Sequence, residues 1–171
     1  FEFTYHEKDG AIYYQSVDVH LQLKPEYESL QAVVEEGNAM IEIAKAICDQ
    51  IINEHESNQM RLLAAHDYLI LNTAYLVGEN EYDNTATSCL LRGVSRCHGY
   101  ALSFQFLSML MQMESHVVIG LGTNETGTQP HAWNYVVLED QGYFVDVTFD
   151  DPMTLEASLS DFIPMRSYFL R

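Results

Sequence analysis

A single cysteine, Cys97, stands in the run GVSRCHGYA (residues 93–101), immediately before a helical pattern. A thiol attacks a carbonyl carbon well only as the thiolate, and a position at a helix N-terminus lowers the pKa of a thiol. The positive charge of the preceding residue, Arg96, could favour the thiolate as well, although neighbours in sequence often point to opposite sides. A cysteine without a base is nevertheless more often a buried and inert residue. Cys97 is therefore a candidate nucleophile whose role depends on partners elsewhere in the chain.

A histidine and an aspartate further along the chain are the candidate partners. His131 opens a strand-like run at the end of a predicted sheet, where its imidazole could reach the start of the Cys97 helix and act as a general base. Asp146 lies between apolar residues in YFVDVTF (143–149), so its carboxylate is expected on a half-buried strand. A buried carboxylate needs a partner, and an imidazole is a suitable one. An outward-facing strand aspartate fits the same pattern equally well.

The spacing along the chain leaves the pairing of these two side chains open. A predicted hairpin turn at Asp140–Gly142 pairs residues 131–139 with residues 142–150, which places Asp146 opposite Tyr135 and away from the histidine. The gap would then be two or more residue rises of about 3.3 Å each. A long loop or a β-bulge could close that gap, so the spacing allows a Cys–His–Asp set without requiring it.

The surrounding pattern predicts helices that are followed by an antiparallel sheet. Alternating residues on either side of Asp9–Gly10 predict two strands, and apolar residues at three- and four-residue steps after Pro25 predict an amphipathic helix. Ser57 is a candidate N-cap for a second helix, and residues 77–88 are predicted to form a polar loop. The Cys97 helix and three strand-like runs follow (116–122, 131–139 and 142–150). This order predicts an α+β fold.

Length and composition predict one globular domain. The chain has 171 residues, of which 47% are apolar, and this is enough to form a hydrophobic core. We expect a single domain over residues 1–171, with an N-terminal strand and helical region at 1–56 and a catalytic core at 57–171.

The charge of the chain excludes some partners. The net charge is −17 and the isoelectric point lies near 4.5. Such a field repels a phosphate backbone, so a nucleic-acid partner is not expected, and an anionic membrane surface is disfavoured for the same reason. No apolar run reaches the length of a membrane span. The charge favours a basic or lysine-bearing protein or peptide as partner, although an acidic surface that only aids solubility explains it as well.

The remaining cysteines and acidic residues give no sign of a metal site. The chain has three cysteines (Cys48, Cys89 and Cys97), with no CxxC pair and no Cys/His cluster of zinc-ligand spacing. An odd number permits one disulfide bridge and one free thiol. The adjacent acids Asp150 and Asp151 are expected to form a turn rather than a cation site. We therefore expect neither a metal nor a cofactor.

Three blocks together resemble a known family. CHGYALSFQFLSML (97–110), HAWNYV (131–136) and YFVDVTFDDP (143–152) are similar, in order and spacing, to the motifs of the transglutaminase-like superfamily of papain-fold thiol enzymes. Bacterial members typically show Cys-x-Gly-Tyr-Ala, then His-Ala-Trp-Asn, then Val-Asp-x-Thr-Trp-Asp-Asp-Pro. Three ordered blocks form a specific signal where one alone would be weak. The resemblance implies a papain-like α+β fold, with N-terminal helices packed on an antiparallel sheet and the nucleophile at a helix N-terminus.

The resemblance also implies a role for each candidate residue. Cys97 would be the nucleophile and acyl carrier, His131 would take and return the proton, and Asp146 would orient the imidazole. The backbone N–H of Cys97 would supply part of the oxyanion hole. Trp133 and Asn134 would brace the histidine strand.

The activity implied is thiol-dependent acyl transfer or hydrolysis at peptide or amide bonds through a thioester, as in a protease, a deamidase or a cross-linking transglutaminase. Hydrolysis and cross-linking share one acyl-enzyme and stay open as alternatives. A non-catalytic protein- or peptide-binding module on the same fold, within a larger cell-surface protein, is the second interpretation. The first residue is Phe1 rather than Met, which is typical of a mature or trimmed chain, and with the habit of bacterial relatives it favours an extracellular or cell-envelope location.

The sequence departs from the family pattern near the nucleophile. Arg96 stands where a small apolar residue is usual, and His98 stands where Gln, Glu or Asp is frequent. Successive helical residues diverge by about 100°, so His98 is not expected to be the base for its neighbour. His66, in an apolar helical stretch, is expected to be a structural histidine. Phe149 replaces the usual tryptophan.

Overall fold

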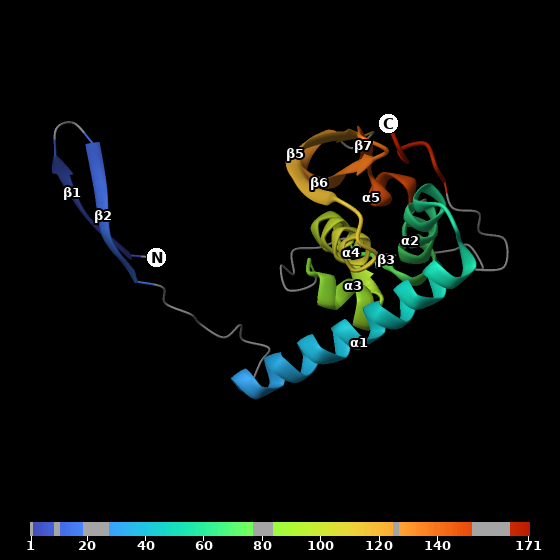
Figure 1. Ribbon diagram of the computed structural model, residues 1–171, viewed down its shortest axis with the longest axis horizontal. Helices are drawn as coiled ribbons and strands as arrows, with labels where there is room; N and C mark the ends of the chain where they lie inside the picture. Colours follow the sequence, from blue (N-terminus) through green and yellow to red (C-terminus); the bar gives the residue numbers. More distant parts are fainter. Residues whose placement is uncertain (1, 9–10, 19–27, 77–83, 125–126, 152–164) are drawn as a thin grey trace. The chain divides into compact units, whose positions relative to one another are not determined.

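The computed structural model describes residues 2–8, 11–18, 28–76, 84–124, 127–151 and 165–171 (Figure 1). The chain divides into two compact units, Phe1–Glu35 and Glu36–Arg171. Helix α1 (Leu30–Glu54) runs through this division. The prediction of one domain over residues 1–171, with an N-terminal region at 1–56 and a catalytic core at 57–171, stays a prediction.

The first unit contains a β-hairpin. Strands β1 (Glu2–Lys8) and β2 (Ala11–Asp18) pair antiparallel, with Lys8 opposite Ala11. The register shifts between Thr4 and Tyr5. Both predicted strands are therefore present, and the expected turn residues between them lie outside the described part of the chain.

The helices of the second unit follow the predicted order, with two additions. Ser57 caps α2, since its hydroxyl accepts the backbone N–H of Met60, as the sequence predicts. The prediction of a loop over residues 77–88 is wrong at its end, because Thr85 starts a short helix through a capping box with Ser88; residues 77–83 lie outside the described residues. Besides α1, the helices are α2 (Asn58–Asn72), α3 (Ala86–Arg92), α4 (Cys97–Leu110) and α5 (Val147–Asp150).

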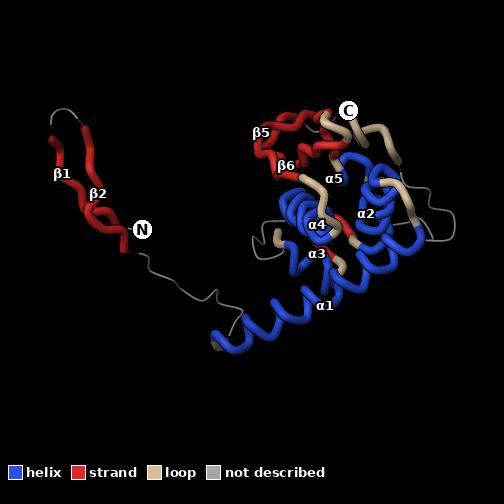
Figure 2. The backbone as a smooth tube through the Cα atoms, viewed as in Figure 1, coloured by secondary structure: helices blue, strands red, loops and turns tan. Residues whose placement is uncertain are grey.

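The described residues of this unit also form two sheets (Figure 2). Strands β3 (Ala74–Tyr75) and β4 (Val94–Ser95) form a short parallel pair. The antiparallel sheet has the order β5-β6-β7, formed by Ser115–Asn124, Gly127–Leu138 and Gln141–Val145.

The hairpin between β6 and β7 differs from the predicted one. Glu139 and Asp140 form its two-residue turn, with φ of 52° and 61°, and Leu138 pairs with Gln141. Two residues of positive φ match the right-handed twist of the strands, which is why such turns close hairpins. The expected turn at residues 140–142 and the pairing of Asp146 with Tyr135 are therefore wrong. The predicted strand over 142–150 is also wrong in its second half, which forms α5.

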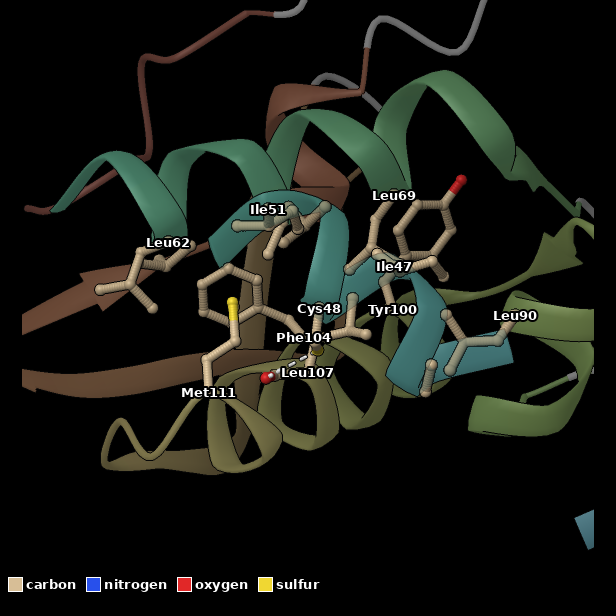
Figure 3. Packing of buried hydrophobic residues seen from close by; sticks show 14 of the residues in the cluster. Ile47, Cys48, Ile51, Leu62, Leu69, Leu90, Tyr100, Phe104, Leu107 and Met111 are labelled. Carbon is tan, nitrogen blue, oxygen red and sulfur yellow. Dashed lines mark hydrogen bonds between the residues drawn. The ribbon is translucent and has the colours of Figure 1, made fainter. Parts of the chain in front are cut away.

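The core lies around α4. This helix packs against β5 and β6 on one side and against α2 and α3 on others, as Figure 1 shows. Figure 3 shows α1 and α2 closing over it, with the thiol of Cys48 donating a 3.5 Å hydrogen bond to the carbonyl of Leu107. The buried apolar side chains there include Ile47, Ile51, Leu62, Leu69, Leu90, Phe104, Leu107 and Met111. All three cysteines are free thiols.

Among the described residues, no helix combines the length and the apolar character that crossing a membrane requires.

Candidate active site

The parallel strand pair β3–β4 positions the residues immediately before Cys97. The backbone N–H of Ala74 donates to the carbonyl of Gly93, and that of Leu76 donates to the carbonyl of Ser95, both at 2.8 Å. Arg96 is then the N-cap residue of α4, and Cys97 is the first residue of the helix, as predicted. The thiol is partly exposed. Local structure thus places it at the positive end of the helix dipole.

Gly99 lets the starts of two helices approach each other. Its backbone N–H donates to Asn84 Oδ1 at 3.0 Å. A Cβ atom at this position would lie 1.9 Å from Ser95 Oγ and 2.7 Å from the carbonyl oxygen of Thr85, the N-cap of α3. The glycine of the motif therefore holds the first turn of α4 against the N-cap of α3.

Tyr100 holds the first turn of α4 in place through the contacts of its hydroxyl. Its hydroxyl lies 2.8 Å from the carbonyl oxygen of Thr73 and 2.7 Å from a carboxylate oxygen of Asp151. The tyrosine is fully buried, and burial together with the Asp151 charge raises the pKa of its hydroxyl. Instead of a simple turn, Asp150 ends α5 and Asp151 is its C-cap, and both carboxylates are buried and bind a distant side chain.

His131 lies within β6 rather than at its start, since that strand begins at Gly127. Its Nε2 lies 2.7 Å from Asp146 Oδ2. The ring of Phe149 stacks on the imidazole at a centroid distance of 4.3 Å, and Trp133 stacks at 5.9 Å. Neighbouring rings therefore fix the orientation of a histidine that is only 5% exposed.

The carboxylate of Asp146 reaches the imidazole of His131 because strand β7 ends just before Asp146. β7 ends at Val145, and Asp146 is the N-cap of α5, where Oδ1 accepts the backbone N–H of Phe149 at 3.0 Å. One carboxylate oxygen thus caps a helix while the other binds the imidazole. No β-bulge is needed.

Asn134 connects the histidine strand to the cysteine helix. Its side-chain Nδ2 donates to the carbonyl of Ala101 at 2.9 Å, and the residue is fully buried. This contact joins β6 to the second turn of α4. Asn134 therefore braces the site, as expected, and does not face the reacting atoms.

The structure brings the three predicted residues close together, with His131 between Asp146 and Cys97. Cys97 and His131 line the same cavity, and the His131 side chain lowers the pKa of the Cys97 thiol. Because Nε2 is engaged by Asp146, Nδ1 is the ring nitrogen left for the thiol. Burial alone would raise the pKa of the Cys97 thiol. The interactions with the His131 side chain and with the backbone of Ala132 and His98 outweigh burial, so the net pKa is lowered below the ordinary thiol range.

The pKa of His131 is shifted in the opposite direction, upward. Burial lowers the pKa of His131, but the hydrogen bonds with Asp146 and Cys97 and their charges outweigh it and raise the pKa to about 9. At neutral pH the arrangement therefore favours a thiolate beside an imidazolium ion.

A cavity of about 430 Å³ opens beside Cys97 and His131. The sequence patterns did not point to two of its walls, Tyr75 and Asn84, because each comes from a segment remote from the three motifs. Arg96 and His98 also line it. Cys97, which is partly exposed, therefore adjoins an open cavity.

His66 lies away from this cavity. It is fully buried, with Nδ1 at 3.0 Å from Asp67 Oδ1 and Nε2 at 3.2 Å from Asp150 Oδ2. The expectation of a structural histidine is confirmed.

The sequence profile of the transglutaminase-like superfamily matches residues 45–147, which is more than half of the chain. The span contains Cys97, His131 and Asp146 and the elements that carry them. The chain therefore belongs to the transglutaminase-like superfamily.

Solved structures show the same fold. A protein described as a TGase has 14% sequence identity and a TM-score of 0.59, over 84% of this chain and 41% of its own. A candidate cysteine protease from Cytophaga hutchinsonii has 15% identity and a TM-score of 0.55, over 68% of this chain and 44% of its own. The chain thus spans less than half the length of these proteins. A search of curated protein sequences found no match.

Proposed function

We propose that this chain carries the catalytic site of a thiol acyl-transfer enzyme that acts on amide bonds of a protein or peptide substrate. The supporting observation is that His131, bonded to Asp146 at 2.7 Å, shares an open cavity with Cys97, the first residue of α4. Cys97 is the nucleophile, His131 the general acid and base, and Asp146 the group that orients the imidazole.

In the first step the Cys97 thiolate attacks the amide carbonyl carbon from the cavity. The carbonyl oxygen becomes an oxyanion next to the backbone N–H of Cys97, which lies in the first turn of α4 and has no acceptor within that helix. The His131 imidazolium gives its proton to the departing nitrogen, the carbon–nitrogen bond breaks, and an amine or ammonia leaves. Cys97 is then held as a thioester.

In the second step a nucleophile enters from the cavity and His131 accepts its proton. Water gives a carboxylic acid, whereas a primary amine gives a new amide, and either one regenerates the thiolate. The same acyl-enzyme thus serves a protease, a deamidase and a cross-linking enzyme, and the competition between water and amine distinguishes them. An extracellular or cell-envelope location stays a prediction from the sequence.

Acylation by an active ester tests the proposal. With p-nitrophenyl acetate we expect a burst of one equivalent of p-nitrophenolate and an acetyl group on Cys97, located by peptide mass spectrometry. Cys97→Ala abolishes both signals. Cys48→Ala is the matched control and leaves them intact, because burial raises the pKa of the Cys48 thiol to about 11.

Added primary amine then separates the two outcomes of the second step. Formation of the acetylated amine in place of acetate would assign transfer, and acetate alone would assign hydrolysis. Absence of any acetyl-Cys97 in the folded parent protein would contradict the proposed function.

A further inference from the structure

In the described part of the chain, two nitrogen atoms of the Arg96 guanidinium are left without partners next to the candidate nucleophile. Among the residues that the structure describes, its Nε and Nη2 atoms are buried and neither has a hydrogen-bond partner. A guanidinium carries five N–H donors, and buried donors of a charged group are costly when they are unpaired. Buried polar groups are nearly always paired, so this exception needs an explanation.

Helix stability does not explain this arginine. Arg96 is the N-cap residue of α4, yet its side chain makes no capping hydrogen bond. A positive charge at a helix N-terminus opposes the helix dipole. The residue therefore weakens the helix that carries Cys97, and a benefit is to be sought in the cavity that it lines.

The described lining of that cavity has a basic residue and no acidic one. Its described lining residues include Arg96, His98 and His131, and they include no aspartate or glutamate. This holds in a chain with a net charge of −17. A cavity of about 430 Å³ with a cationic wall attracts an anion of small size.

We propose that Arg96 binds a carboxylate of the acyl donor, so that the enzyme selects acidic peptides in which this carboxylate lies close to the reacting carbonyl. The inference rests on the proposed function and names its substrate class. A carboxylate that enters the cavity and draws the guanidinium toward it supplies the acceptors that Nε and Nη2 lack, and the planar fork suits two parallel hydrogen bonds. The basic or lysine-bearing partner expected from the net charge would then be the amine that resolves the thioester.

Two alkylating reagents of nearly equal size provide the test. Iodoacetate and iodoacetamide both place a CH₂ group on the thiolate with loss of iodide, but only the first carries a carboxylate. We expect iodoacetate to alkylate Cys97 with saturation kinetics and at a higher rate than iodoacetamide, despite the acidic chain. In Arg96→Gln the ratio of the two rates falls about tenfold or more, as expected for the loss of a charge-assisted hydrogen bond.

Arg92→Gln is the matched control, since it removes the same charge from an exposed arginine that pairs with Glu36 and does not line the cavity. We expect it to leave the ratio unchanged. Arg96→Lys keeps the charge without the planar fork and is expected to give an intermediate ratio. An equal ratio in the parent protein and Arg96→Gln would overturn the inference.

A second experiment needs no variant, because it measures how well small carboxylates protect Cys97 of the parent protein against alkylation. N-acetylglutamic acid amide carries a side-chain carboxylate and N-acetylglycine carries an α-carboxylate, and we expect one of them to slow the alkylation of Cys97 by iodoacetamide. The one that protects identifies the source of the carboxylate. N-acetylglutamine amide and N-acetylglycinamide are the uncharged controls, and protection by neither acid, or equal protection by the uncharged compounds, would overturn the inference.

Failure of the carboxylate site can be distinguished from failure of the proposed function. If the rate ratio depends on Arg96 but Cys97 forms no acyl-enzyme, the carboxylate site stands and the enzyme proposal fails. If Cys97 is acylated but neither the ratio nor the protection shows a carboxylate effect, the enzyme proposal stands and the carboxylate site fails.

Discussion

Two buried histidines in this chain share the same chemistry but have different surroundings. His131 binds Asp146 at 2.7 Å, and His66 binds Asp150 at 3.2 Å. Hydrogen bonds to carboxylates outweigh burial in both and raise the pKa of each imidazole. The second ring nitrogen of His131 is left for a thiol at an open cavity, whereas that of His66 binds a further carboxylate, Asp67.

The comparison shows that a histidine–aspartate pair does not by itself make a site. His66 is completely enclosed, and Asp150 also accepts the backbone N–H of Tyr168, so this pair joins α2 and α5 to the C-terminal segment. The His131 pair instead adjoins the Cys97 thiol and an open cavity. We therefore expect substitutions at the first pair to change stability and substitutions at the second to change reactivity.

The largest effect is expected at Asp146. Asp146→Asn keeps an N-cap for α5, because asparagine caps helices as well as aspartate, but it removes the charge that supports the imidazolium. The acylation rate should fall about a thousandfold or more, by analogy with the aspartate of other triads. Rapid-quench acylation measures the rate, and a change in unfolding free energy above about 1 kcal/mol would instead indicate a structural role.

Asp150→Ala should give the converse result. It leaves a buried imidazole with one partner and a backbone N–H with none, so the free energy of unfolding should fall by about 3 kcal/mol or more. Denaturant titration measures this loss. The folded fraction should still be alkylated at Cys97 at the parental rate, and a large loss of thiol reactivity per folded molecule would contradict the contrast between the two pairs.

The pH dependence of acylation should reflect the two partners of the candidate ion pair. The rate rises as Cys97 loses its proton, below the ordinary thiol range, and falls as His131 loses its proton near pH 9. Because Asp146 raises the pKa of His131, Asp146→Asn should move the falling limb to lower pH. A falling limb that stays in place would exclude His131 as the group that titrates.

The smallest effect is expected from the protonation of His66. Its pKa is raised in the folded protein, so protonation stabilises the fold fully below the unfolded value of about 6.5. This stabilisation is lost as the pH rises through the folded value. The difference in unfolding free energy between the parent protein and His66→Gln should therefore shrink with rising pH above neutrality, and a difference that grows would refute the assignment.

Local patterns predicted the elements near Cys97 but not the arrangement around Asp146. The N-terminal position of Cys97 in α4 and the Ser57 cap follow from residues close in the chain. The end of β7 at Val145 was not visible, because apolar residues flank Asp146 on both sides and a four-residue helix has too little periodicity to detect.

The buried acids after α5 were missed for a related reason. A pair of aspartates before a proline resembles a turn, and nothing near them in the sequence indicates burial. Their partners are His66 and Tyr100, which lie 84 and 51 positions away in the chain. Only the tertiary fold brings these groups together.

The most direct test of the account is the pH dependence of Cys97 alkylation by iodoacetamide, followed at the level of the Cys97 peptide in the parent protein and in His131→Ala. His98→Ala is the matched control, because it removes the neighbouring imidazole of the same cavity. We expect an apparent pKa below the ordinary thiol value of about 8.5 in the parent and in His98→Ala, and a clearly higher one in His131→Ala. An ordinary thiol pKa in the parent, unchanged by the loss of His131, would contradict this expectation.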